Sequence, residues 1–189
     1  MKEAERNLRD DVYEILISEA SLKARTGELA QEITKDYRQV DDLLLICVLK
    51  GAFVFLADLT RELHRPHHLD FMGISSYGSG TVSSGAVRIV MDLKEDIAGR
   101  DVLIVEDIID SGRTLDYMLR ALLARSPASI RICSLLSKPS RREVDVPIDY
   151  LGFEIPDEFV VGYGLDFGEI YRNLPFIAVL KPEFFAHIP

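Results

Sequence analysis

Short runs of apolar residues alternate along this chain with segments in which apolar residues recur every three or four positions. Two of the runs, Leu43–Leu49 and 102–105, are unbroken, as in strands that a parallel sheet buries on both faces. Val12–Ile17 alternates enough to predict another strand. Further strands are predicted for residues 70–77, 87–93, 130–136, 159–161 and 176–180.

Helical periodicity separates these strands. A first helix is expected to begin at Ser18, because its hydroxyl can accept a hydrogen bond from the first turn. Its apolar side would comprise Leu22, Leu29, Ile33 and Tyr37. Residues 52–64 predict a second helix, which Pro66 ends. A third is expected to start near Arg113 and stop before Pro127. Its apolar stripe would comprise Leu115, Met118, Leu119, Leu122 and Leu123.

Strands that alternate with helices predict an α/β fold with a mostly parallel twisted sheet flanked by helices. At 189 residues the chain is expected to form a single domain over 1–189. In open sheets of this kind, ligands bind at the carboxyl ends of the strands. Lys50-Gly51, residues 110–114 and Ser137-Lys138 each follow a predicted strand. We therefore expect these three loops to converge on one ligand.

Composition and charge narrow the class of protein. The apolar runs are too short to cross a bilayer, and residues 1–6 are not followed by an apolar signal region, so we expect a cytoplasmic protein without membrane contact. Cys47 and Cys133 both lie in predicted strands, which favours reduced core thiols. The net charge of −9 argues against nucleic acid as the main partner. Lys138, Arg141 and Arg142 form a local basic cluster, either a solvated loop or an anion site.

The segment that follows residues 102–105 combines a turn suited to phosphate with three carboxylates. Gly112 allows a tight turn, the next helix begins there with unpaired N–H groups, and Ser111 and Thr114 add hydroxyls. Neither G-x-G-x-x-G nor G-x-x-x-x-G-K-[ST] occurs. Glu106 and Asp107 would repel a phosphate but can accept hydrogen bonds from sugar hydroxyls. The turn, with Asp110 as the third acid, therefore predicts a site for a phosphorylated ribose.

A glycine-rich segment, residues 78–85, joins two predicted strands and is too long for a tight hairpin. It is interpreted either as a disordered surface loop or as a lid that closes over a reactive intermediate.

Residues 102–115 resemble the phosphoribosyl-pyrophosphate signature of the type I phosphoribosyltransferases. The order and spacing of five other segments resemble the hypoxanthine-guanine branch of that family. These segments are Leu49-Lys50-Gly51, Ser76-Tyr77, 135–138, 152–166 and Arg172. The resemblance covers about residues 43–180 and is less distinctive before them. It implies the type I fold with a small hood subdomain built from the N- and C-terminal segments, and a homodimer or homotetramer.

The resemblance also implies roles for individual residues. Lys50, Gly51 and Arg172 are predicted to bind the pyrophosphate, and the family often has a cis peptide at Lys50. Ser76 and Tyr77 would lie on the closing loop, and Glu106 and Asp107 would bind the ribose. The 5′-phosphate would be bound by Ser111, Gly112, Arg113 and Thr114. At position 113 the backbone N–H is expected to matter more than the side chain. Glu106, Asp107 and Asp166 would hold Mg²⁺.

For the purine, the resemblance implies that Asp110 is the base that takes the ring proton, that Lys138 donates to the oxygen at position 6, and that Phe159 stacks on the ring beside the Val160 backbone. From composition alone, Phe159 would be a core residue and Lys138 and Arg172 solvated charges. An ammonium has donors and no acceptor, which favours a 6-oxopurine. Two alternatives stay open: an RNA-binding regulator that senses phosphoribosyl pyrophosphate, and a transferase for adenine, orotate or uracil.

Overall fold

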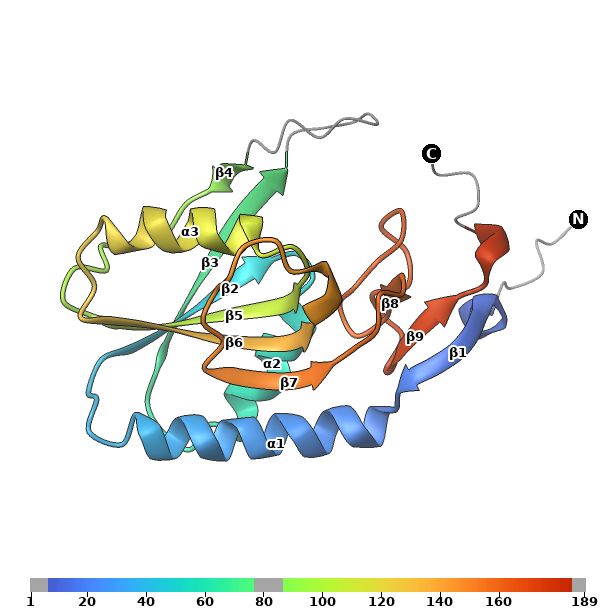
Figure 1. Ribbon diagram of the computed structural model, residues 1–189. Helices are drawn as coiled ribbons and strands as arrows, with labels where there is room; N and C mark the ends of the chain where they lie inside the picture. Colours follow the sequence, from blue (N-terminus) through green and yellow to red (C-terminus); the bar gives the residue numbers. More distant parts are fainter. Residues whose placement is uncertain (1–6, 77–86, 185–189) are drawn as a thin grey trace, which may run out of the picture.

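The structure is a computed structural model that describes residues 7–76 and 87–184. Within these residues the chain forms two sheets, of order β4-β3-β2-β5-β6-β7 and β1-β9-β8 (Figure 1). The strands are β1 (Val12–Ile17), β2 (Leu43–Leu49), β3 (His68–Ser76), β4 (Val87–Met91), β5 (Asp101–Ile109), β6 (Ser129–Ser137), β7 (Tyr150–Glu154), β8 (Val160–Val161) and β9 (Ile177–Leu180). The helices are α1 (Glu19–Asp36), α2 (Phe53–Glu62) and α3 (Arg113–Leu123), with 3-10 turns at Leu8–Asp11, Pro139–Arg141 and Pro182–Phe184.

The six-stranded sheet is parallel except at its edge, where β4 runs antiparallel to β3. Helices α1 and α2 cover one face and α3 covers the other (Figure 1). The predicted α/β fold with a mostly parallel sheet is confirmed. After β2 the chain passes through α2 to β3 on one side, whereas β5 leads through α3 to β6 on the other. The carboxyl ends of β2 and β5 therefore flank the crevice in which such sheets bind ligands.

Strand β2 shows why the sequence pattern is unbroken here. Leu45 and Cys47 pack into the core formed with α1 and α2, while Ile46 and Val48 pack into the core formed with α3. Alternate side chains thus enter two different cores, so both faces of the strand must be apolar.

The helix predictions are largely confirmed. Ser18 is the N-cap of α1, and its Oγ accepts a hydrogen bond of 3.1 Å from Ser21 N. Helix α3 begins at Arg113 and ends before Pro127, as predicted. The prediction that Leu123 belongs to the buried stripe of α3 is wrong, because this last helical residue is 57% exposed.

The smaller sheet forms the hood that the family resemblance implied. β1 has the predicted bounds but pairs antiparallel with β9, which in turn pairs with β8. Val161, Phe176 and Ala178 contribute to a separate apolar cluster in this part. Figure 1 shows β1 and β9 side by side, with α1 leading from β1 under the large sheet. The first and last described strands thus combine into one unit beside the carboxyl ends of β5 and β6.

Several strand and helix ends lie one or two residues from their predicted positions, and two larger differences concern β5 and β7. Strand β5 continues past Val105 to Ile109, since residues 108 and 109 still pair with β6. Glu106 and Asp107 therefore lie on the strand and not in the turn. Strand β7 was missed, because its sequence has no long apolar run. Its Gly152 lies so close to β6 that an added Cβ would be 2.3 Å from the carbonyl oxygen of Leu135.

Both cysteines are free and buried, as predicted. Burial raises the pKa of Cys47 to about 12 and also raises that of Cys133, so both thiols stay neutral near neutral pH. Among the residues that the structure describes, no helix is both long and apolar enough to cross a bilayer.

Candidate active site

The turn between β5 and α3 lines a cavity of about 210 Å³, formed by residues 106–112, Thr114 and Leu115. Gly112 is the N-cap of α3 and has a φ of 84°, a left-handed conformation that favours glycine. A Cβ at this position would be 2.4 Å from the carbonyl oxygen of Val144. Glycine offers no side chain to cap the helix, and of the first N–H groups of α3 that of Arg113 donates to Ser111 Oγ at 3.4 Å. The start of a helix with N–H groups of this kind is suited to an anion.

A second segment, residues 138–144, lies along this turn. The carbonyl oxygen of Ser111 accepts hydrogen bonds of 3.0 Å from the N–H groups of Glu143 and Val144. The Arg113 side chain is half exposed and turns to Glu143, with 2.7 Å between Nε and Oε2. The turn is therefore held mainly by backbone contacts, and the Arg113 side chain is occupied on its outer side.

Glu106 and Asp107 form a carboxylate pair at the end of β5. Glu106 is buried, and its Oε2 has no hydrogen-bond partner within the described residues. Burial and the neighbouring Asp107 charge raise the pKa of Glu106 well above its ordinary value. Burial also raises the pKa of Asp107, to about 6, although the N–H of Ile108 donates to its Oδ1. A cation near this pair would stabilise both ionised carboxylates.

The loop after β2 reaches the same carboxylates. A Cβ added to Gly51 would be 1.4 Å from Asp107 Oδ2, so any other residue here would displace the Asp107 carboxylate. The peptide bond between Leu49 and Lys50 is cis. Lys50 Nζ forms an ion pair of 3.0 Å with Glu169 Oε2, which ties this loop to the segment after β8.

That later segment, residues 162–172, carries Asp166 and Arg172. Arg172 donates to the carbonyl oxygen of Gly164 at 2.8 Å and pairs with Asp166 Oδ1 at 2.7 Å. Its side chain is 18% exposed, so it is not the solvated surface charge that composition suggests. The Arg172 charge lowers the pKa of Asp107 and the Asp166 charge raises it, so both charges act on this carboxylate.

Lys138 and Asp110 are connected by ion pairs that run through Asp157 and Arg141. The backbone N–H of Lys138 donates to the carbonyl oxygen of Ile109 at 3.0 Å, and the Lys138 side chain is only 10% exposed. Its Nζ lies 3.7 Å from Asp157 Oδ1. Arg141 Nε lies 3.3 Å from Asp110 Oδ1 and 3.8 Å from the same Asp157 oxygen.

Phe159 and Val160 lie at the start of β8, an edge strand of the smaller sheet. Phe159 is 41% exposed, which contradicts the core assignment that burial statistics favour. Its ring packs edge to face on Phe167, with 5.6 Å between ring centres. Val160 is buried and pairs with Val179 of β9. Phe159 thus lies two residues after Asp157, the partner of Lys138.

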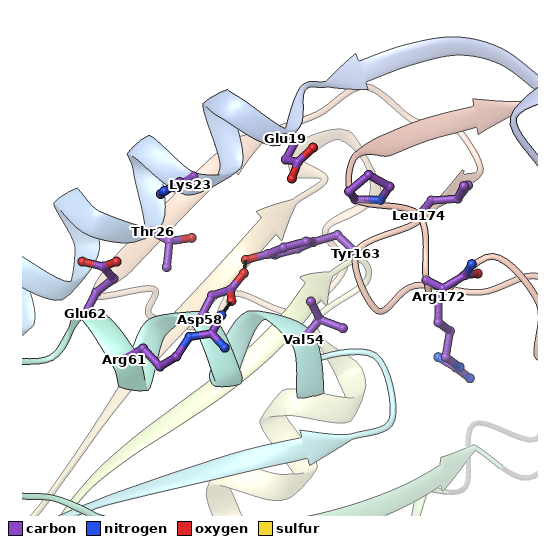
Figure 2. A pocket seen from close by; sticks show the side chains of 12 residues that line it. Glu19, Lys23, Thr26, Val54, Asp58, Arg61, Glu62, Tyr163, Arg172 and Leu174 are labelled. Atoms are coloured by element: carbon purple, nitrogen blue, oxygen red, sulfur yellow. Dashed lines mark hydrogen bonds and ion pairs between the residues drawn. The ribbon is translucent and has the colours of Figure 1, made fainter.

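A larger cavity of about 540 Å³ lies behind residues 163–175, between α1 and α2 (Figure 2). It shares Arg172 with the residues predicted from the sequence, and its walls carry charges of both signs, such as Lys23 and Glu62. The Tyr163 hydroxyl donates a hydrogen bond of 2.6 Å to Asp58 Oδ2 across one side of it (Figure 2). The chemistry predicted from the sequence belongs to the smaller cavity, where the phosphate turn and the paired carboxylates lie.

The loop after β2 lies against Asp107, and the backbone N–H of Lys138 donates to Ile109, so two of the three loops predicted to converge border the end of β5 that leads into the third. Among the predicted site residues, Tyr77 and the predicted lid at 78–85 lie outside the described residues, and Ser76 is described only as the last residue of β3. Sequence reasoning did not single out Glu169, Tyr163 or Asp157. Tyr163 and Glu169 have positive φ values of 51° and 67°, a property that a side-chain pattern does not reveal.

Three comparisons with known proteins agree on the family. Residues 12–168 match the phosphoribosyl transferase domain. The hypoxanthine phosphoribosyltransferase of Salmonella typhimurium is 54% identical over 165 residues, which cover 87% of this chain and 93% of that protein. The hypoxanthine-guanine phosphoribosyltransferase of Mycobacterium tuberculosis is 51% identical over 178 residues, which cover 92% of this chain and 88% of that protein.

The crystal structure of a hypoxanthine phosphoribosyltransferase from Staphylococcus aureus superposes with a TM-score of 0.91 and 43% identity, covering 97% of this chain and 99% of that one. The match therefore extends over the hood as well as the phosphate turn. On the fold, the geometry of the site and these similarities, the chain belongs to the phosphoribosyltransferase family, in its hypoxanthine-guanine branch.

Proposed function

We propose that this protein is a purine salvage enzyme that transfers the 5-phosphoribosyl group from phosphoribosyl pyrophosphate to a 6-oxopurine, with release of pyrophosphate. The observation that carries this proposal is the contact between Gly51 and Asp107, which joins the loop after β2 to the carboxylates of β5. It sets a predicted pyrophosphate loop directly against a predicted ribose site. Family membership supports the same reaction.

The sugar phosphate would lie across the carboxyl ends of β2 and β5. Ser111, Gly112, Arg113 and Thr114 would hold the 5′-phosphate, chiefly through N–H groups at the start of α3. Glu106 and Asp107 would accept hydrogen bonds from the ribose hydroxyls. Lys50 of the loop after β2 and Arg172 of the segment after β8 supply cations that suit the pyrophosphate.

The carboxylates also fit Mg²⁺. This ion commonly binds one or two protein carboxylates together with substrate phosphates, and keeps several waters. Within the described residues no group of three His, Cys, Asp or Glu side chains forms a protein-only metal site. The unpartnered Oε2 of Glu106, with Asp107 beside it and Asp166 nearby, supplies oxygen donors of the required kind. When bound, Mg²⁺ would neutralise the charge of the departing pyrophosphate.

The base would enter between the phosphate turn and the hood. Lys138 Nζ is largely buried, and its ion pair with Asp157 is too long for a hydrogen bond, so its donors suit a carbonyl oxygen. The exposed Phe159 ring can stack on a purine beside the Val160 backbone.

In the reaction, the bond between ribose C1 and pyrophosphate breaks while a purine nitrogen attacks the same carbon, through a transition state with oxocarbenium character. Asp110 would accept the proton that the purine nitrogen loses. Its carboxylate is 46% exposed at the mouth of the turn and so is accessible to an incoming base. The residues of the turn keep the sugar fixed while this proton moves.

Two alternatives remain from the sequence. A regulator that binds RNA would use the same phosphate turn, and an enzyme for another base would keep the sugar site. The basic cluster does not favour the regulator, because Arg141 pairs with Asp110 and Arg142 donates to Ser137 Oγ at 2.7 Å. These cations face the site and its supporting strand. Lys138 favours a 6-oxo base over adenine.

The test is direct. Purified protein with Mg²⁺ and phosphoribosyl pyrophosphate should release pyrophosphate when hypoxanthine or guanine is added, and not when adenine is added. Equal turnover of adenine would overturn the base assignment, and no turnover with any base would favour the regulator. Chelation of Mg²⁺ should abolish the activity and added Mg²⁺ should restore it.

We also propose a cytoplasmic homo-oligomer, a dimer or tetramer. Support comes from an apolar edge of the large sheet. Leu69, Phe71, Val90 and Met91 of β3 and β4 are each at least 38% exposed. Val90 and Met91 lie over Gly73, on the face that Leu69 and Phe71 share. Adjacent exposed apolar side chains of this kind mark interaction surfaces.

A further inference from the structure

Arg141 occupies a position between two carboxylates that come from different loops. Asp110 lies in the turn after β5, and Asp157 lies between β7 and β8. The Arg141 Nε is 3.3 Å from Asp110 Oδ1 and 3.8 Å from Asp157 Oδ1. Arg141 itself lies in the 3-10 turn Pro139–Arg141, directly after Lys138. One guanidinium thus connects the phosphate turn to the segment between β7 and β8, which contains Asp157 and Phe159.

Asp157 also connects to the predicted purine-binding lysine. Its Oδ1 is 3.7 Å from Lys138 Nζ, so this single oxygen faces two cations. Lys138 is the more buried of the two, with 10% of its side chain exposed against 53% for Arg141. Charge interactions at the Lys138 end are therefore less screened by water.

A carboxylate next to Lys138 competes with any ligand carbonyl for the ammonium. While Arg141 neutralises part of the Asp157 charge, this competition is weak, and Lys138 stays beyond hydrogen-bond distance of Asp157. Without Arg141, Asp157 would have Lys138 as its remaining ion-pair partner among the described residues. The ammonium would then be drawn toward Asp157 and away from the base.

We propose that Arg141 is a positioning residue that neutralises Asp157 and thereby keeps Lys138 available to the carbonyl oxygen of the purine. This inference rests on the proposed function, since it assigns Lys138 to the base. It concerns how the base is recognised and leaves the sugar-phosphate contacts unchanged. Arginine suits the position because its planar fork can face two carboxylates at once, which a lysine ammonium does less well.

Steady-state kinetics of four proteins test the proposal: the wild type, Arg141→Ala, Asp157→Asn and the double variant. Arg141→Ala should raise the KM for hypoxanthine by about three- to tenfold, the scale expected for a partly exposed ion pair. The KM for phosphoribosyl pyrophosphate should stay within about twofold, because the Arg141 side chain reaches the phosphate turn at Asp110, which is assigned to the purine and not to the phosphate. Asp157→Asn should leave the KM for hypoxanthine unchanged or lower.

The double variant is decisive. Once Asp157 is neutral, the loss of Arg141 no longer exposes a competing carboxylate, so the KM for hypoxanthine should return toward the wild-type value. Arg120→Ala is the matched control, because Arg120 is an exposed arginine that pairs with Asp116 on α3, away from the base. It should not change either KM.

The outcomes separate the two proposals. Turnover by the wild type together with an unchanged KM in Arg141→Ala would overturn the role of Arg141 alone. A raised KM that Asp157→Asn does not reverse would also overturn it, since a purely structural arginine gives that result. Absence of wild-type turnover with every base would overturn the proposed function and this inference with it.

Discussion

The Tyr163 hydroxyl donates a hydrogen bond of 2.6 Å to Asp58 Oδ2, across 105 positions of the sequence. This contact joins the segment that carries Arg172 to helix α2, which begins just after Lys50 and Gly51. The contact therefore joins the two segments predicted to bind the pyrophosphate, the loop after β2 and residues 162–172. Close packing of Gly164 on the carbonyl oxygen of Gly51, where a Cβ would be 2.1 Å away, strengthens the same junction.

Tyr163→Phe should lower the free energy of unfolding by about 1 kcal/mol, the usual value of one hydrogen bond. Burial raises the pKa of Tyr163, and the Asp58 contact raises it further, so the hydroxyl remains a donor at every pH near neutral. Urea unfolding would measure the change. Tyr13→Phe removes the hydroxyl of a residue that is 70% exposed and should have no effect. Equal stability of both variants would show that the Tyr163 contact contributes nothing.

Gly112→Ala should damage the phosphate turn. The new Cβ would be 2.4 Å from the backbone oxygen of Val144, and the left-handed φ adds strain of about 1–2 kcal/mol. We expect the KM for phosphoribosyl pyrophosphate to rise by about tenfold or more, since N–H groups at the helix start would move.

Gly99→Ala provides a matched control for this substitution. Gly99 also has a positive φ, of 75°, but no atom lies within 4 Å of an added Cβ. The Gly99→Ala variant should be less stable than the wild type, and its KM for phosphoribosyl pyrophosphate should be unchanged. The same KM in both variants would remove Gly112 from the phosphate site.

Asp110→Asn should lower kcat by about ten- to a thousandfold, as expected when a general base is lost. The KM for phosphoribosyl pyrophosphate should change little, because Asp110 is assigned to the purine and not to the sugar. Initial rates with hypoxanthine would measure both constants. An unchanged kcat would exclude Asp110 as the base. Asp92→Asn, on the surface beside Arg125, should leave kcat unchanged.

Phe71→Lys should shift the protein toward monomers if β3 and β4 form the interface. A charge placed within an apolar contact costs free energy on association, because it must lose its water. Light scattering after size-exclusion chromatography would give the mass. Leu123→Lys changes another exposed apolar residue, at the end of α3, and should not alter the mass. A wild-type monomer would contradict the proposed oligomer.

Several elements could be read from the sequence because their causes are local. The bounds of β1 and β2 and the cap at Ser18 depend on neighbouring residues, and each was predicted correctly. The end of β5 could not be read in this way. Its last residues are preceded by Glu106 and Asp107, and pairing with β6 is what keeps them extended. Strand β7 is likewise defined by β6 and by the carbonyl groups of Leu151 and Gly152, which accept hydrogen bonds from Arg25.

By itself the sequence determined the α/β class, the helix starts and the turn at Gly112, together with the family resemblance that assigns the purine. Only the tertiary structure decided that β1 pairs with β9 and that Glu169 reaches Lys50. It alone placed Arg141 between Asp110 and Asp157. The reason is physical: periodicity and capping act over a few residues, whereas these contacts join distant segments whose approach depends on how the whole chain packs.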